Sequence, residues 1–474
     1  MKEYTTPQLR NVAFVGHSGS GKTTLAEAML FAAGAIKRRG AVTDGNTVMD
    51  YDEEEIRRKI SLSLSVAPIE WGDCKINLLD TPGYTDFVGE VRSALRVADL
   101  TAVVVDAAAG VEVGTELTWD YAAEEEVPVM VLVNKMDREN ASFEKALKSL
   151  GEFFPETRFV PIVLPIGAQA DFRGIVDVIE GKAYMGPNGD PAAVPAAMAS
   201  AVEEARVAVI EAAAEGDDEL IMKYLEGEEL TPDEVLQGLR QGILKRALVP
   251  VVALAGNSMI GVKHLLDLLV TLAPSPADLG TFSAENAQGE TVTYPISDTS
   301  PLAVLVFKTA ADPYVGKLTY FRVYGGLITT GSTLYNARAG QDDRLGQTNV
   351  PMGKDLIPVE RLHAGDIGVV SKMSVTLTGD TLCARDNVLK LRGPNFPHPL
   401  YSVAVYPKTK ADTAKMGATL TRICEEDPTL HWTPDPVTRE TILSGMGDAH
   451  VDTAVRRMAS RFGVNLEIRT PRIP

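Results

Sequence analysis

The chain has 474 residues, of which 45% are hydrophobic and 23% charged, and its formal net charge is −18 at pH 7. This length predicts about three domains, and the acidic balance disfavours general nucleic-acid binding, so any RNA contact would be local. No apolar run approaches the ~20 residues of a membrane-spanning helix, and no secretory signal opens the chain. The three cysteines are scattered, which indicates reduced thiols. Because no coiled-coil pattern is present either, we expect a cytoplasmic monomer without a membrane or DNA partner.

The first motif in the chain is the phosphate-binding pattern G-x-x-x-x-G-K-[ST], matched at every fixed position by Gly16-His17-Ser18-Gly19-Ser20-Gly21-Lys22-Thr23. It lies between an apolar strand candidate at residues 11–15 and a helical run that begins at Thr24, and we assign residues 16–24 to nucleotide binding. In this context the backbone N–H groups bind a phosphate, Lys22 reaches the β- and γ-phosphates, and the Thr23 hydroxyl binds Mg²⁺. The alternative is a flexible Gly/Ser turn, which the flanking strand and helix disfavour.

A second apolar strand candidate, at residues 74–79, ends at Asp80-Thr81-Pro82-Gly83. Asp80 can hold Mg²⁺ through water, and the N–H of Gly83 can bind a γ-phosphate. A loop that senses the γ-phosphate is therefore predicted to begin here.

Two further apolar runs follow, and the second ends in Asn134-Lys135-Met136-Asp137. The Asp137 carboxylate can accept both the N1–H and the N2 amine of guanine, whereas adenine would leave it unpaired, and such sites discriminate by up to ~10⁴-fold or more. GTP is therefore preferred to ATP, which disfavours a P-loop ATPase or kinase. A plain polar loop is the structural alternative for this motif. We assign Asn134, Lys135 and Asp137 to nucleotide binding, together with Ala255-Gly256-Asn257 after a strand candidate at residues 248–255.

We predict an α/β P-loop GTPase domain with an inserted α/β subdomain, followed by a β-barrel domain and an α+β ferredoxin-like domain. Alternating strands and helices indicate a mostly parallel sheet within residues 1–280. An insertion at about residues 155–247 interrupts this sheet and carries acidic helix candidates at 196–214 and 217–225.

The barrel is assigned to residues 281–398, where a polar linker runs to about residue 300 and short apolar runs with Gly and Asp turns follow. The order βαββαβ over residues 399–474 indicates the ferredoxin-like domain, with the apolar faces of its two helices in the core.

These motifs resemble those of the translational GTPases of the elongation factor G family, and the resemblance covers essentially the whole chain. Beyond the nucleotide motifs it is carried by Phe87-Val88-Gly89-Glu90-Val91, Ile166-Gly167-Ala168, Gly174-Ile175-Val176-Asp177, Asp312-Pro313-Tyr314-Val315-Gly316, Ala364-Gly365-Asp366-Ile367, Thr378-Gly379-Asp380-Thr381-Leu382-Cys383, Pro407-Lys408-Thr409-Lys410-Ala411-Asp412 and Gly445-Met446-Gly447-Asp448-Ala449-His450.

The resemblance implies a GTP-hydrolysing translation factor that binds GTP or GDP with Mg²⁺ and acts on the ribosome in elongation and translocation. Its partners would be ribosomal RNA and the stalk proteins, the latter through acidic residues such as Glu211 and Glu215, for which a solvated helix face is the alternative. Family members continue into domains IV and V, whereas this chain stops at Pro474. We therefore expect a fragment that binds nucleotide but does not support translocation.

Three features of the sequence depart from the family pattern. Tyr84 replaces the histidine that is thought to position the attacking water, and a phenol with pKa ~10 orients water but accepts its proton poorly near neutrality. Gly19 replaces an aspartate that would bind a monovalent cation. Arg58-Lys59-Ile60-Ser61 replaces Arg-Gly-Ile-Thr, although Ser61 keeps a hydroxyl for Mg²⁺, and residues 50–61 are expected to be a mobile loop without GTP.

These departures indicate a paralogue of the translocase. By resemblance, Tyr84, Lys22 and Gly83 are the candidate catalytic residues, and Thr23, Ser61 and Asp80 the candidate metal ligands. The leading hypothesis is a ribosome-stimulated GTPase. The alternatives are a guanine-nucleotide-dependent regulator that has lost hydrolysis, and a ribosomal-protection, release-factor or recycling GTPase.

Overall fold

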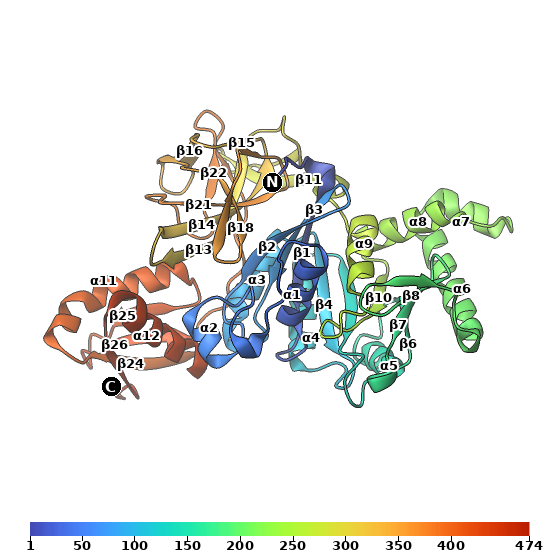
Figure 1. Ribbon diagram of the computed structural model, residues 1–474. Coiled ribbons are helices and arrows are strands. Elements are labelled where there is room, and N and C mark those ends of the chain that lie inside the picture. The colour runs from blue at the N-terminus through green and yellow to red at the C-terminus, as the bar shows by residue number, and fades with distance from the viewer. Residues whose placement is uncertain (474) are drawn as a thin grey trace.

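The computed structural model describes residues 1–473, which form an α/β domain, a β-rich domain and a small α+β domain (Figure 1). The first domain has a ten-stranded sheet in the order β2-β3-β1-β4-β5-β10-β6-β7-β8-β9. Its parallel strands are β1 (Leu9–Val15), β3 (Cys74–Asp80), β4 (Leu100–Asp106), β5 (Val129–Asn134), β6 (Phe159–Ile166) and β10 (Val249–Ala253). The strand β2 (Ser65–Trp71) pairs antiparallel with β3 at one edge. Every residue of β1, β3 and β4 is buried, as is typical of parallel strands covered on both faces.

The helices of this domain connect the parallel strands and lie against the sheet (Figure 1). They are α1 (Lys22–Ala32), α3 (Val88–Val97), α4 (Val113–Glu124), α5 (Phe143–Phe153) and α9 (Val262–Leu272). Short 3₁₀ turns lie at η1 (Thr6–Gln8), η2 (Val42–Asp44), η3 (Thr85–Phe87), η4 (Gln169–Asp171) and η5 (Ala196–Met198). The loops after β1, β3, β5 and β10 all leave the carboxyl edge of the sheet, which is where ligands bind in open α/β sheets.

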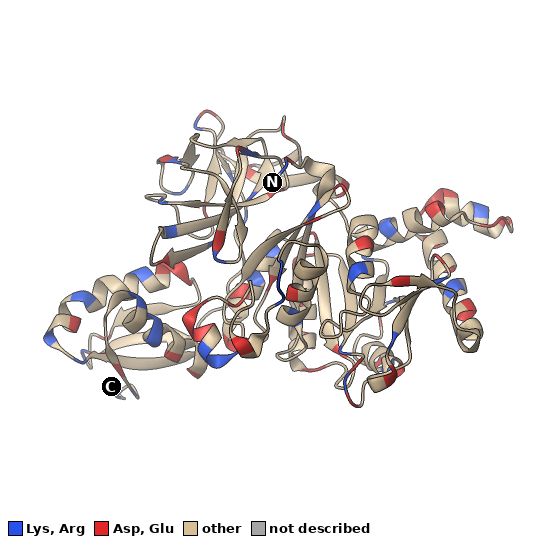
Figure 2. Ribbon diagram, viewed as in Figure 1, with Lys and Arg blue, Asp and Glu red and all other residues tan. Residues whose placement is uncertain are grey.

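The inserted residues extend the sheet as well as carrying helices. Strand β6 pairs parallel with β10, and β7 (Gly174–Asp177), β8 (Lys182–Met185) and β9 (Asp190–Ala192) continue it antiparallel. No strand was predicted here, because Pro161 and Pro165 interrupt the apolar pattern of β6. The register of β6 against β10 shifts between Val251 and Val252, beside Pro161. Three helices follow, α6 (Ala199–Glu215), α7 (Asp218–Leu225) and α8 (Pro232–Leu244). Helix α6 packs on β6 and α8 packs on α9, and Figure 2 shows acidic residues along the three helices.

The prediction of a polar linker up to residue 300 is wrong. After α10 (Pro276–Leu279), the hairpin of β11 (Thr281–Asn286) and β12 (Thr291–Pro295) forms a three-stranded sheet with β23 (Leu389–Lys390). Phe282 and Ala284 alternate with exposed residues along β11 and are buried. Two buried residues in a polar segment give too weak an alternation to be recognised as a strand.

The second domain is an antiparallel sheet in the order β17-β16-β22-β13-β14-β21-β18-β19. A single apolar core, which includes Val304, Phe321, Leu334, Val370 and Leu382, receives side chains from strands along most of this sheet, as in a barrel. The strands of this sheet are β13 (Ala303–Asp312), β14 (Gly316–Gly325), β16 (Thr333–Asn336), β17 (Gln341–Arg344), β18 (Asn349–Met352), β19 (Asp355–Pro358), β21 (Ile367–Ser371) and β22 (Thr381–Cys383). Two short strands, β15 (Ile328–Thr329) and β20 (Arg361–Leu362), pair with each other in a separate sheet.

The third domain has the order βαββαβ, with an antiparallel sheet β25-β26-β24-β27. Its elements are β24 (Tyr401–Pro407), α11 (Lys410–Glu426), β25 (His431–Pro434), β26 (Thr441–Gly445), α12 (Asp448–Phe462) and β27 (Leu466–Arg469). Leu420 on α11 and Met458 on α12 pack with Val405 and Leu443 of the sheet in one core. This is the ferredoxin-like arrangement, so the predicted fold class is confirmed.

The first and second domains share a buried polar interface. Lys75 Nζ lies 2.8 Å from Asp366 Oδ2, and Arg322 Nη1 lies 2.6 Å from Asp99 Oδ1, with all four side chains at most 3% exposed. The third domain contacts the first through α12 (Figure 1). No helix among residues 1–473 is long and apolar enough to span a bilayer.

Candidate functional site

The loop between β1 and α1 has a backbone that only glycines can adopt without strain. Gly16, Gly19 and Gly21 have φ of 147°, 82° and 93°. A Cβ on Gly16 would lie 2.4 Å from the carbonyl oxygen of Val104, and one on Gly21 would lie 2.5 Å from Nδ2 of Asn134. Gly19 has open space around it. The glycines of the pattern are therefore required by this loop's own geometry.

Beside this loop lies a cavity of about 550 Å³, a size typical of small-molecule sites. The structure brings thirteen predicted site residues to its wall, from five separate segments of the chain: Ser18, Gly19, Gly21, Lys22, Thr23, Thr24, Ser61, Gly83, Tyr84, Asn134, Lys135, Asp137 and Asn257. The other predicted site residues do not line the cavity: Gly16, His17, Ser20, Asp80, Ala255 and Gly256. The wall also includes five residues that sequence reasoning misses: Val42, Asp50, Lys59, Ile60 and Arg138.

Lys22 is a buried cation at the first turn of α1. Its Nζ donates to the carbonyl oxygens of Gly16 and His17, at 3.0 and 2.9 Å. Burial lowers the pKa of Lys22 to about 8, although the nearby Asp80 and Asp50 favour its charged form. An anion in the cavity would therefore stabilise this ammonium group.

Two hydroxyls and two carboxylates meet next to Lys22. Thr23 Oγ1 donates to Asp80 Oδ2 at 2.7 Å, and Ser61 Oγ donates to Asp50 Oδ1 at 2.7 Å; the two hydroxyl oxygens are themselves 2.7 Å apart. Burial raises the pKa of Asp50, and burial together with Asp50 raises that of Asp80 to about 7. Asp80 Oδ1 and Asp50 Oδ2 are buried without a hydrogen-bond partner.

This donor set fits Mg²⁺, which prefers oxygen ligands and keeps several positions for water and phosphate. A divalent cation would satisfy both unpartnered oxygens and remove the cost of burying two carboxylates together. Among residues 1–473 no group of three or more His, Cys, Asp or Glu side chains could hold a metal. A cation beside these two carboxylates would therefore also need the hydroxyls of Thr23 and Ser61 and the ligand's own oxygens to complete its coordination.

The residues at the end of β5 connect the loops on the other side of the cavity. Asn134 Nδ2 donates to the carbonyl oxygen of Ser20, and Asn134 Oδ1 accepts the N–H of Gly256, both at 3.0 Å. Lys135 adopts a φ of 63° and its Nζ donates to the carbonyl oxygen of Gly19 at 2.6 Å. Asp137 lines the cavity half-buried. These contacts hold the loops after β1, β5 and β10 around one cavity.

Three predicted residues have supporting positions. The His17 imidazole contacts α4 and not the cavity, because its Nδ1 accepts the N–H of Gly114 at 3.0 Å. Ala255 donates its N–H to the carbonyl oxygen of Ile260, which closes the loop after β10. The backbone carbonyl oxygen of Asn257 accepts a hydrogen bond from Arg39 Nη1 at 2.9 Å.

Gly83 and Tyr84 lie where the loop after β3 meets the phosphate-binding loop. A Cβ on Gly83 would lie 2.6 Å from the Ser18 nitrogen and 2.8 Å from Lys22 Nζ, so this contact requires glycine. The Tyr84 side chain is 45% exposed at the cavity wall and directly precedes η3.

Residues 53–58 form the helix α2 (Glu53–Arg58), which corrects the expectation of a mobile loop at 50–61. Asp52 caps this helix by accepting the N–H of Glu54 at 2.9 Å, and the Glu55 carboxylate accepts the N–H of Leu62, also at 2.9 Å. Lys59 ends the helix with a φ of 57°, a conformation that favours glycine.

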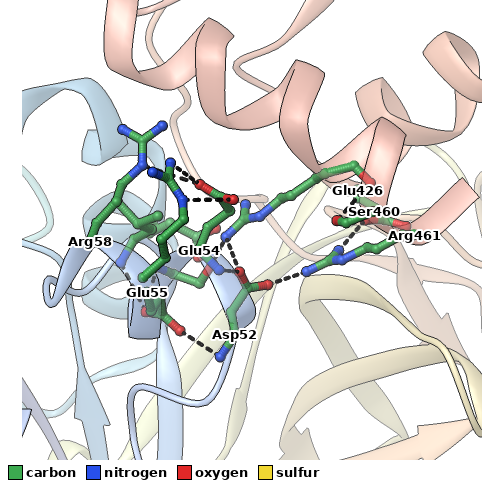
Figure 3. A network of polar contacts seen from close by, with 12 residues as sticks. Asp52, Glu54, Glu55, Arg58, Glu426, Ser460 and Arg461 are labelled. Carbon is green, nitrogen blue, oxygen red and sulfur yellow. Dashed lines mark hydrogen bonds and ion pairs between the residues drawn. The ribbon is translucent and has the colours of Figure 1, made fainter. Parts of the chain in front are cut away.

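Side chains of the third domain hold α2 from the outside, as Figure 3 shows. Asp52 pairs with Arg461, and its Oδ1 lies 3.6 Å from Arg457 Nη2. Arg58 Nη2 lies 2.7 Å from Asp452 Oδ2. Because α2 separates Asp50 from Ser61, these contacts also help to place those two residues at the cavity wall.

Comparisons with known proteins agree with this geometry. Residues 7–275 match the model of the elongation factor Tu GTP binding domain, residues 301–385 match elongation factor G domain 2, and residues 396–470 match elongation factor G domain III. A protein from Thermus thermophilus, known from its crystal structure, is 36% identical and superposes with a TM-score of 0.89, over 99% of this chain and 68% of that one. The chain therefore belongs to the elongation factor G family of translational GTPases.

Proposed function

We propose that this protein binds GTP and GDP with Mg²⁺ in the cavity, hydrolyses GTP, and acts on the ribosome in elongation. The observation that carries the proposal is the meeting of three groups at one cavity: the buried Lys22, the guanine-type motif at residues 134–137, and the paired hydroxyls and carboxylates of the cation site.

In this proposal the backbone N–H groups of residues 18–22 and the Lys22 ammonium hold the phosphates. Thr23 and Ser61 would bind Mg²⁺ directly, with Asp80 and Asp50 behind them; bound Mg²⁺ neutralises phosphate charge. The N–H of Gly83 orients the γ-phosphate, and Tyr84 orients the attacking water. Because phosphoryl transfer depends mainly on positioning and charge stabilisation, a neutral side chain at position 84 is compatible with hydrolysis.

Base specificity is tested by competition for bound fluorescent GDP. We expect unlabelled GDP to displace it and ADP to require at least ~10³-fold higher concentration, because adenine leaves the Asp137 carboxylate unpaired. Asp137→Asn should weaken GDP binding, whereas Asp120→Asn, an exposed acid on α4, should leave it unchanged. Equal displacement by ADP and GDP would contradict the assignment.

A second candidate function is a regulator that binds GTP without hydrolysing it. Tyr84 favours this candidate, because it stands where the family has histidine and a phenol is a poor proton acceptor near neutral pH. Slow single-turnover hydrolysis that ribosomes do not accelerate would support the regulator over the enzyme. Protection of ribosomes and recycling are further roles within the same family.

For partners we propose ribosomal RNA and stalk proteins, with the protein monomeric in the cytoplasm. Of the two acidic candidates for the stalk, Glu215 is exposed and pairs with Arg158, and Glu211 is half-buried and accepts from the Tyr224 hydroxyl at 3.4 Å. Replacing Glu215 with Gln should lower ribosome-stimulated hydrolysis while leaving hydrolysis without ribosomes unchanged, if the stalk binds here.

A further inference from the structure

The helix α12 is capped from another domain. Its own N-cap residue is Gly447, which has no side chain to accept the free N–H groups of the first turn. The Asp86 carboxylate of η3 takes this place, because its Oδ2 accepts the N–H of His450 at 3.1 Å. A side chain of the first domain thus acts as the N-cap of a helix in the third domain.

Gly447 leaves the space that this contact needs. Its φ is −176°, an extended conformation open to any residue, so backbone strain does not explain the glycine. A Cβ at position 447 would lie 2.6 Å from both carboxylate oxygens of Asp86, closer than atoms can approach. The absence of a side chain at position 447 is therefore what lets η3 reach the end of α12.

The third-domain side of the contact is held firmly. His450 is buried, its Nε2 lies 2.7 Å from Asp427 Oδ2, and its Nδ1 accepts the N–H of Met446 at 2.9 Å. The buried ring of Phe87 packs edge-on against the His450 ring, with 5.6 Å between centroids. Two neighbouring residues of η3, Asp86 and Phe87, therefore meet a surface that is already fixed within its own domain.

This contact lies next to the residues that face the cavity. Tyr84 directly precedes η3, and its carbonyl oxygen accepts the N–H of Phe87 at 3.1 Å. Gly83, one residue earlier, rests against Ser18 and Lys22. The short segment from Gly83 to Asp86 therefore contacts the loop between β1 and α1 at one end and α12 at the other.

We propose that Asp86 and Gly447 are positioning residues for GTP hydrolysis: by capping α12, Asp86 holds η3 in place and so keeps Tyr84 and Gly83 aligned with the γ-phosphate. This inference rests on the proposed function. The docking of the third domain then directly affects the rate of GTP hydrolysis. It does not affect the affinity for nucleotide, because neither Asp86 nor Gly447 lines the cavity.

The test compares variants of the full-length protein in ribosome-stimulated GTP hydrolysis. Asp86→Ala should lower kcat about tenfold, because losing the cap of α12 misaligns one group at the reacting phosphate. The KM for GTP and the Kd for GDP should stay within about twofold of the wild-type values. Asp86→Asn should recover most of the rate, because its amide oxygen still accepts the His450 N–H.

Gly447→Ala should lower kcat like Asp86→Ala, because its methyl group displaces the carboxylate. The double variant should be no slower than either single variant, since both changes remove one contact. Two matched controls lie in the same domain. Thr409→Ala removes the cap of α11, and Gly417→Ala adds a methyl group on α11 where the nearest side-chain atom is 4.0 Å away. Both should keep the wild-type kcat.

An unchanged kcat in Asp86→Ala, an equal loss in Thr409→Ala, or additive losses in the double variant would each overturn the inference. A wild-type protein that does not hydrolyse GTP on ribosomes would instead refute the proposed function. The two failures are distinguished by the wild-type rate.

Discussion

At the scale of single residues, Asp343 shows how one carboxylate organises a loop of the second domain. It accepts hydrogen bonds from the backbone N–H groups of Ser374 and Val375, at 3.1 and 3.0 Å, and from the hydroxyls of Ser374 and Thr376, at 3.0 and 2.8 Å. Burial acts to raise the pKa of Asp343, but these hydrogen bonds outweigh it and hold the pKa below its usual value.

This shift predicts an acid-dependent stability. Because the pKa of Asp343 is lower in the folded than in the unfolded protein, the ionised carboxylate stabilises the fold. This stabilisation is fully present above the unfolded pKa of about 3.9 and is lost as the pH falls through the folded-state pKa. Asp343→Asn should lower the free energy of the unfolding transition that includes the second domain by about 1–3 kcal/mol at pH 7, and by less below pH ~4. Urea unfolding at both pH values measures this. The exposed neighbour Asp342 provides the control as Asp342→Asn, and a difference that is independent of pH would contradict the account.

The residue scale also shows what the sequence could predict about the site. Fixed spacing identified Lys22, Thr23 and the residues at 134–137, because each motif follows a recognisable strand. Asp50 was missed, since residues 50–55 contain five acids in six positions and no spacing distinguishes one of them. Only the fold brings Asp50 to 2.7 Å from Ser61.

At the scale of elements, the structure predicts that the third domain stabilises α2. The ion pair between Arg58 and Asp452 joins α2 to α12, with side chains 19% and 38% exposed. A partly exposed pair of this kind contributes about 0.2–1 kcal/mol, so Asp452→Ala should speed hydrogen exchange of the α2 amides about two- to fivefold. Salt should reduce the difference between the variants.

The matched control for this prediction is Arg456→Ala. Arg456 also pairs with Asp452, at 3.0 Å, but along α12 itself. Its loss should leave exchange in α2 near the wild-type rate. Equal acceleration by both variants would mean that α12 was weakened generally and that α2 does not depend on the contact between domains.

Element prediction from sequence succeeded where the apolar pattern was long and failed where it was short or interrupted. The fold class is confirmed, including the βαββαβ order of the last domain. Strand β6 was missed because two prolines interrupt it, and the β11–β12 hairpin because most of its side chains are exposed. The helix α2 lies in a segment that was expected to be a mobile loop without GTP. One sequence could not show that Arg457 and Arg461, about 400 residues away in the chain, contact its N-cap residue Asp52.

At the scale of the whole molecule, the buried polar interface should make the first two domains unfold together. Asp366→Ala would leave Lys75 buried without its ion-pair partner, and breaking a buried pair in this way costs about 3–5 kcal/mol. Calorimetry should show a lower transition temperature and a separation of the two domain transitions. The double variant Lys75→Met with Asp366→Leu should recover most of the loss, and a loss below ~0.5 kcal/mol in Asp366→Ala would contradict this role.

Contacts between domains lie beyond what one sequence can predict. Lys75 and Asp366 are 291 positions apart, and hydrophobic periodicity gives no information on which distant residues meet. The resemblance to a family predicted the order of the domains, whereas the ion pairs that join them came only from the structure.

The most direct test of the central claim is GTP hydrolysis by the full-length protein with and without ribosomes, comparing wild type with Tyr84→His. We expect ribosomes to stimulate the wild-type protein strongly, because in the proposed function Tyr84, which lines the cavity, orients water while Lys22 and Mg²⁺ supply the charge stabilisation. Tyr84→His should then be at least as active. No stimulation of the wild-type protein, with activity restored in Tyr84→His, would contradict the account and indicate a guanine-nucleotide switch that no longer hydrolyses GTP.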